Sequence, residues 1–166
     1  MKITIAEYSS AWLQMFAEEK TRLQRILPVS AVVKHIGSTS VPGLAAKPVI
    51  DIMVGLTDFT QADALVSGVQ SLGYEYVSQF EVEMPFRRYF RKDNEGVRTH
   101  QIHVVALNSE FWHRHLAFRE YLKAHPNIAA EYATLKRSLA EQEWQDVNDY
   151  ADAKTEFIQS IEAQAS

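Results

Sequence analysis

Cysteine is absent from the 166 residues of this chain. Disulfide bonds and thiolate metal sites are therefore excluded, and the composition is compatible with a reducing compartment such as the cytoplasm. Long apolar runs are absent as well: nothing approaches the roughly 20 apolar residues of a membrane span, and no signal-peptide core follows Met1. We expect a cytoplasmic protein with no membrane segment.

Positive charge is not in excess. The chain carries 17 Lys and Arg against 21 Asp and Glu, a formal net charge of −4. That balance argues against an extended nucleic-acid-binding surface, although a local basic patch is compatible with it. Low-complexity segments, linkers and repeats are missing, and 46% of the residues are apolar. We predict a single domain over 1–166.

The spacing of apolar residues predicts helices at both ends of the chain and strands between them. Thr60 and Asp63 form a capping-box pattern, and Gly73 occupies the position of a C-terminal cap. The predicted elements are a helix over about 10–27, a strand over 31–36, a loop or short helix over 41–46, a strand over 49–56, a helix over 60–72, a strand over 74–77, a hairpin of 87–92 and 97–106, a helix capped by Asn108 or Ser109 and ending at 123, a helix from Pro126 to about Trp144, and a helix from 147 to about 161. This order favours an α+β fold with a mixed sheet of about five strands, flanking helices and a helical C-terminal third.

Asp51 interrupts the otherwise apolar strand 49–56. A carboxylate in a buried strand is costly unless it binds a cation, forms an ion pair or lines a cleft. The preceding strand ends in Gly37-Ser38-Thr39-Ser40, where a glycine and hydroxyl groups can approach a phosphate closely. Nucleotidyltransferases hold a triphosphate and its divalent ions with such a turn beside an acidic strand. We predict a site between the turn and Asp51, with an ordinary ion pair as the alternative for this carboxylate.

Two histidines lie on the predicted strand 97–106. Because side chains alternate along a strand, His100 and His103 face opposite sides, and His103 shares its face with Gln101 and Val105. Each histidine can be a core residue, a metal ligand or an acid–base group. We take His103 as a candidate for the site. Surface positions are predicted for His113, His115 and His125.

The densest basic cluster lies on the predicted hairpin and comprises Arg87, Arg88, Arg91, Lys92 and Arg98. It either guards the edge of the sheet with solvated charges or binds a phosphate through an inward-facing arginine. A two-residue loop centred on Asn94-Glu95 would place Arg88 opposite Gln101. One further loop residue would place Arg87 opposite His103, so the register is open.

The stretch from His35 to Ile52, HIGSTSVPGLAAKPVIDI, resembles the signature of the GrpB family, also called UPF0157, whose domain occurs fused to dephospho-CoA kinase in some bacteria. The resemblance continues through 98–105, 118–122, Tyr132, Leu135, Lys136, Tyr150 and Lys154. Members of this family are placed in the nucleotidyltransferase-fold superfamily, so the resemblance implies that fold for nearly the whole chain. It implies no settled substrate or reaction.

This chain departs from the superfamily pattern, which places two carboxylates two residues apart on one strand. The residues at that spacing from Asp51 are Val49 and Met53, and the neighbouring strand offers His103 in place of the third carboxylate. The nearest acidic substitutes are Glu81 and Glu83. Three further residues of the family pattern either point into a shared cleft or pair with Glu120 and Asp152: Arg119, Lys136 and Lys154.

The leading hypothesis is a nucleotidyltransferase-like enzyme that moves a nucleotidyl or phosphoryl group from a nucleoside triphosphate to an unknown acceptor. Catalytic and metal-binding roles go to Asp51 and His103, with Mg²⁺ or Mn²⁺ as the ion. The triphosphate is held by Gly37, Ser38, Thr39, Ser40, Lys47, Arg87 and Arg88. Lys47 has the alternative role of neutralising the surroundings of Asp51. Two other functions suit the same scaffold: a catalytically silent module that binds a nucleotide or another phosphorylated ligand, and a metal-dependent hydrolase or lyase.

Overall fold

The computed structural model describes residues 4–141 and 147–165, with side chains of the last helix from Lys154 onward. Within these ranges the strands are β1 (Val32–Ile36), β2 (Ile50–Leu56), β3 (Glu75–Val77), β4 (Arg87–Asn94) and β5 (Val97–Ala106). The helices are α1 (Ala11–Gln24), α2 (Val66–Ser71), α3 (Glu110–Ala124), α4 (Pro126–Ala140) and α5 (Val147–Ala165), and short 3-10 turns form η1 (Ser38–Ser40), η2 (Phe59–Gln61) and η3 (Asp63–Leu65). The predicted α+β fold is confirmed.

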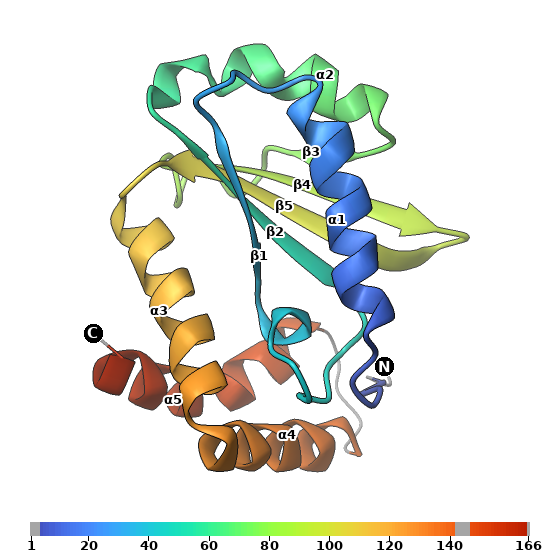
Figure 1. Cartoon of the computed structure of the whole chain (residues 1–166), viewed down its shortest axis with the longest axis vertical. Coiled ribbons are helices and arrows are strands. Elements are labelled where there is room, and N and C mark those ends of the chain that lie inside the picture. The colour runs from blue at the N-terminus through green and yellow to red at the C-terminus, as the bar shows by residue number, and fades with distance from the viewer. Residues whose placement is uncertain (1–3, 142–146, 166) are drawn as a thin grey trace.

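The strands form one mixed sheet in the order β1-β2-β5-β4-β3, with β2 parallel to β5 and the other neighbours antiparallel. Because side chains alternate along β2, Ile50, Ile52 and Val54 point to one face and Asp51 and Met53 to the other. The first face packs against α1 and α2 in the largest apolar core. Figure 1 shows α3, α4 and α5 gathered on the loop that joins β1 to β2. The acidic residue therefore faces the C-terminal helices.

The β4–β5 hairpin differs from both predicted registers. Its two-residue loop is Glu95-Gly96 rather than Asn94-Glu95, with φ of 52° and 81°. Positive φ at both positions gives the turn geometry that matches the twist of paired strands, and glycine adopts it without steric cost. A bulge in the hairpin then shifts the pairing by a further residue. The resulting pairs are Arg87–Val105 and Arg88–Val104.

The predicted helix over 60–72 begins differently and is shorter. Asp58 is the cap, because its carboxylate accepts hydrogen bonds from the N–H of Thr60 at 3.0 Å and from the Thr60 hydroxyl at 2.6 Å. The capping box of Thr60 with Asp63 was therefore wrong, and η2 and η3 precede the six residues of α2. Gly73 follows α2 with φ of 95°, as a C-terminal cap requires.

The C-terminal helices follow the predicted order. Ser109 caps α3 through its hydroxyl, and Pro126 begins α4. The described part of α4 ends at Ala140, and its predicted end at Trp144 lies outside the described residues. The last helix, α5, continues past the predicted end at Ile161. Over the described ranges, no helix combines the length and the hydrophobicity needed to cross a membrane.

Candidate functional site

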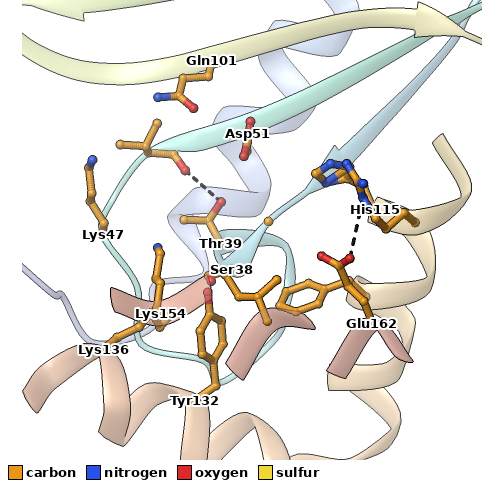
Figure 2. Close-up of a pocket in the computed structure, with 15 residues that line it drawn as sticks. Ser38, Thr39, Lys47, Asp51, Gln101, His115, Tyr132, Lys136, Lys154 and Glu162 are labelled. Carbon is orange, nitrogen blue, oxygen red and sulfur yellow. Dashed lines mark hydrogen bonds and ion pairs between the residues drawn. The ribbon is translucent and has the colours of Figure 1, made fainter. Parts of the chain in front are cut away.

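A cavity of about 260 Å³ lies where the loop after β1, the start of β2 and the C-terminal helices meet (Figure 2). It is lined by Gly37, Ser38, Thr39, Lys47, Val49, Asp51, Gln101, Arg114, His115, Phe118, Tyr132, Lys136, Lys154, Ile158 and Glu162. Asp51 and Ser38 thus face the same space, which is the juxtaposition that the sequence predicted. Residues from α3, α4 and α5 form the opposite part of the wall, and Gln101 of β5 also lines the cavity.

Gly37 is required where β1 ends because the Asp51 carboxylate packs against it. Its φ is 73°, and a Cβ atom at this position would lie 3.1 Å from Asp51 Oδ2. A larger residue would be strained in this backbone conformation and would also displace the carboxylate. Ser38, the next residue, also lines the cavity (Figure 2).

The other hydroxyl groups of the turn hold the turn itself. Thr39 Oγ1 donates to the carbonyl of Val49 at 3.1 Å, so it accepts from His35 Nε2, which lies 3.0 Å away. Burial lowers the pKa of His35 to about 4, which keeps this imidazole neutral. The Ser40 hydroxyl donates to the carbonyl of Gly37, and Ser40 is not among the described residues that line the cavity. Of the predicted phosphate-binding hydroxyls, Ser38 is the best placed.

Asp51 is held by a chain of two hydrogen bonds that ends at Arg87. His103 Nε2 lies 2.8 Å from Asp51 Oδ1, and Arg87 Nη1 lies 3.2 Å from Nδ1 of the same ring. A guanidinium can only donate, so Nδ1 accepts and Nε2 donates its hydrogen to Asp51. Burial acts to raise the pKa of Asp51, but the contacts with His103 outweigh it and hold that pKa below its ordinary value. His103 and Arg87 therefore support the carboxylate from behind, and neither is among the described residues that line the cavity.

Three lysines converge on the cavity from separate elements: Lys47 precedes β2, Lys136 lies on α4 and Lys154 lies on α5 (Figure 2). Lys136 Nζ donates to the carbonyl of Ala45 at 2.7 Å and lies 4.4 Å from the centroid of the Tyr132 ring. Burial lowers the pKa of Lys136 to about 7 and that of Lys154 to about 8, and it also lowers the pKa of Lys47. The family pattern contains Lys136 and Lys154, and the structure assigns both to the shared cleft.

His115 was predicted to be a surface residue, and this prediction was wrong. It lines the cavity, its ring centroid lies 4.0 Å from that of Phe111, and burial lowers its pKa to about 4. The spacing of Phe111 and Phe118, four residues before and three residues after His115, marks its face of α3 as inward and could have identified it. His113 and His125 are exposed, as predicted.

Glu162 is a second acidic residue on the cavity wall, and the sequence offered no motif for it. It stands on α5 one turn after Ile158, and its carboxylate lies 3.8 Å from Nε of Arg114 on α3. Both side chains are partly exposed, so this ion pair is loose. The two acidic substitutes that the sequence suggested lie elsewhere: Glu81 bonds to Tyr76 and approaches Arg88, and Glu83 is exposed.

The rest of the basic cluster does not reach the cavity. Its ion pairs are Arg88 with Asp63, Arg91 with Glu75, Lys92 with Glu19 and Arg98 with Asp93. Arg88 is therefore not placed to hold a phosphate in the cavity. The alternative of solvated charges guarding a sheet edge does not fit either, because β3 pairs with β4 and Lys92 pairs with the buried Glu19. Within this cluster, Arg87 is the residue that is hydrogen-bonded to His103 and so connected to Asp51. Arg119 donates to the carbonyl of His35 at 2.8 Å and so ties α3 to β1. His100 is buried on the opposite face of the sheet beside Tyr74.

The sequence profile described as GrpB protein matches residues 2–164. This chain belongs to the GrpB family. The UPF0157 protein YqkA of Bacillus subtilis is 39% identical over 99% of this chain and 47% of its own length, so the chain spans about half of that relative. The crystal structure of the conserved protein GrpB from Enterococcus faecalis shares 41% identity, with a TM-score of 0.88 over 98% of this chain and 96% of that one.

The GrpB fold is also that of nucleotidyltransferases. The Cid1 poly(U) polymerase with bound MgGTP is similar at 18% identity and a TM-score of 0.56, over 84% of this chain and 45% of that one. At this identity the similarity shows the fold alone. The five-stranded mixed sheet with its flanking helices is thus a nucleotidyltransferase-like fold.

The donor set of this GrpB chain does not fit a two-metal site. Val49 and Met53 stand at the positions two residues from Asp51, and Gln101 is the residue paired with Asp51 on β5. In the part of the chain that the structure describes, no three histidine, aspartate or glutamate side chains are grouped to hold a metal ion. The carboxylates among the described residues that line the cavity are Asp51 and Glu162, and Glu162 is paired with Arg114. The lysines make the cavity better suited to an anion than to a divalent cation.

Proposed function

We propose that this GrpB-family protein binds a nucleoside triphosphate, or a ligand with similar phosphate groups, in the cavity beside Gly37-Ser38. The observation that carries the proposal is the convergence of Lys47, Lys136 and Lys154 on that one cavity. Gathering cations in a partly desolvated space costs stability, as the lowered pKa values of these lysines indicate. An anionic ligand offsets that cost by supplying opposite charge.

The geometry divides the roles among the cavity walls. The Ser38 hydroxyl can donate to a phosphate oxygen, and Lys47, which lines the same cavity, can neutralise its charge. Apolar surface from Phe118 and Ile158 on the helical side can contact a base or another non-polar group. Binding of this kind needs no second carboxylate.

Transfer of a nucleotidyl or phosphoryl group is the second candidate function. It is favoured by the two hydrogen bonds that link Arg87 to His103 and His103 to Asp51, because they orient the Asp51 carboxylate in the cavity that Ser38 also lines. Such a carboxylate can accept the proton of an attacking hydroxyl as its bond to phosphorus forms, while the phosphorus–oxygen bond to the leaving group breaks. The leaving group is pyrophosphate in nucleotidyl transfer and the nucleoside diphosphate in phosphoryl transfer. The similarity of the fold to a poly(U) polymerase supports this candidate at the level of architecture.

Calorimetric titration with ATP and with pyrophosphate, each with and without Mg²⁺, tests the binding proposal. We expect saturable binding that Ser38→Ala and Lys47→Gln each weaken by about 1.5–3 kcal/mol, the usual loss for a charge-assisted hydrogen bond. Lys123→Gln, a change at an exposed position of α3, serves as the matched control and leaves binding unaltered. Absence of binding to the wild type at millimolar ligand would refute the proposal.

Turnover of labelled ATP distinguishes group transfer from phosphate binding without reaction. Incubation with ATP labelled at the α- or γ-phosphate, together with a mixture of hydroxyl and amine acceptors, reports transfer of either group. Binding without release of label supports a silent phosphate-binding module. An activity that requires a divalent metal and no nucleotide would favour a hydrolase or lyase on the same scaffold.

A further inference from the structure

Lys154 occupies the middle of the lysine cluster. After burial, the largest influence on the pKa of Lys154 is the charge of Lys47, and the largest on that of Lys136 is the charge of Lys154. Figure 2 shows the side chains of Lys154 and Lys47 extending into the same space, beside Thr39. Lys136 is 2% exposed and donates to the carbonyl of Ala45, so it lies deeper in the wall. Lys154 is half-buried and lines the same cavity.

An amine placed among other cations and away from bulk water loses its proton more readily, and only the neutral amine is a nucleophile. The pKa of about 8 for Lys154 follows from this placement. At pH 7.5 a lysine with pKa 10.4 is about 0.1% neutral, whereas one with a pKa near 8 is about one quarter neutral. The same cavity offers a phosphate-compatible turn at Gly37-Ser38. A ligand held there by a phosphate would present its other end to this amine.

We infer that Lys154 is a reactive amine that forms an imine with a phosphorylated aldehyde or ketone whose phosphate is held at the Gly37-Ser38 turn. The inference rests on the proposed phosphate site and names a ligand class for it. In acetoacetate decarboxylase a neighbouring cation likewise lowers the pKa of the reacting lysine and so favours its neutral amine. Here the neighbouring cation is Lys47.

The reaction is balanced without a further reagent. The nitrogen lone pair of Lys154 attacks the carbonyl carbon, a C–N bond forms, and the carbonyl π electrons move to oxygen, which gains a proton as nitrogen loses one. The carbinolamine then loses its hydroxyl group with a proton as water, while the nitrogen lone pair closes the C=N bond. One amine and one carbonyl compound give one imine and one water, and no group is oxidised or reduced.

Pyridoxal 5′-phosphate is a suitable probe because it carries both an aldehyde and a phosphate, and pyridoxal is its matched control without the phosphate. The wild-type chain is treated with each compound, the imine is trapped with cyanoborohydride, and the modified lysines are quantified by peptide mass spectrometry. We expect Lys154 to be modified about tenfold or more faster than the exposed Lys123, since a larger neutral fraction outweighs the lower basicity of the amine. We also expect pyridoxal to be slower than pyridoxal phosphate at Lys154, and pyrophosphate to protect Lys154 while leaving Lys123 unaffected.

The outcomes distinguish this inference from the proposed function. Modification of Lys154 no faster than that of Lys123, in protein that binds pyrophosphate by calorimetry, overturns the imine inference and leaves the phosphate site standing. Equal rates with pyridoxal and its phosphate overturn the claim that the phosphate positions the carbonyl. Lys154→Arg, which keeps the charge and removes the nucleophile, should abolish the adduct in the cavity. The wild-type measurement decides the question even where that variant is unstable.

Discussion

Replacing Lys136 by methionine removes an ammonium group from the wall of the cavity while keeping a side chain of similar length. In the wild type this group is 2% exposed, donates to the carbonyl of Ala45 at 2.7 Å and lies 4.4 Å from the centroid of the Tyr132 ring. The substitution therefore exchanges an electrostatic penalty for the loss of one hydrogen bond and one cation–π contact. The balance between these effects depends on pH.

The pKa of Lys136 is about 7 in the folded chain, against an ordinary value of 10.5. Such a lowered pKa destabilises the folded state near neutral pH by on the order of 4 kcal/mol. The hydrogen bond and the ring contact offset about 2–3 kcal/mol of this. We expect Lys136→Met to raise the free energy of unfolding near pH 7 by about 1–2 kcal/mol.

The sign of the pH dependence follows from the lowered pKa. The penalty is fully present below pH 7 and declines as pH rises from about 7 to 10.5, because the unfolded chain then retains a proton that the folded chain has lost. The advantage of the methionine variant should shrink by roughly 1 kcal/mol for each pH unit over that interval and reverse between about pH 8 and pH 9. Urea unfolding at a series of pH values measures this difference.

Lys123→Met, at an exposed position of α3, is the matched control and should show a difference from the wild type that does not change with pH. If the curves for the wild type and Lys136→Met run parallel between pH 7 and about pH 9, the Lys136 ammonium is not desolvated. The cavity would then lack the concentrated charge on which the proposed phosphate site rests.

Three other substitutions test separate parts of the site. Gly37→Ala places a Cβ atom 3.1 Å from Asp51 Oδ2. It should lower stability and pyrophosphate affinity more than Gly43→Ala does, because φ is also positive at Gly43 but no atom lies within 4 Å of its added Cβ. Equal losses for the two variants in urea unfolding and calorimetry would show that the contact with Asp51 is unimportant. Asp51→Asn should lower the free energy of unfolding by about 1–3 kcal/mol, as for a hydrogen bond to a charged group, and should tighten pyrophosphate binding by removing a negative charge; weaker binding of Mg²⁺-pyrophosphate alone would instead restore the metal hypothesis. The pKa of His115 falls to about 4 on folding, so the folded chain is destabilised progressively as pH falls from 6.5 to about 4. His115→Leu should reduce this loss of stability by on the order of 3 kcal/mol, measured by thermal unfolding at a series of pH values. His113→Leu, at an exposed position, should leave the loss unchanged.

The sequence by itself determined the fold class and one side of the site, namely Asp51 and the turn at Gly37. The apolar run 49–56 identified Asp51 as the polar residue of a buried strand, and Gly37 marked the turn that its carboxylate contacts. Both inferences depend on rules that act over a few residues, namely the hydrophobicity of a buried strand and the backbone freedom of glycine. Side-chain alternation placed His103 on the strand face opposite to that of His100, and from this face it bonds Asp51.

Tertiary structure alone decided what surrounds that carboxylate. The hairpin register depended on a loop at Glu95-Gly96 and a bulge, each of which moves every later pair, and short-range patterns do not locate a bulge. His115, Lys154 and Glu162 reach the cavity through the rotation and packing of helices far along the chain from Gly37. Their charge matters only once burial lowers the local dielectric, and burial is a property of the assembled molecule. A cluster of cations in one cavity therefore arises from long-range packing, even though each lysine is visible in the sequence.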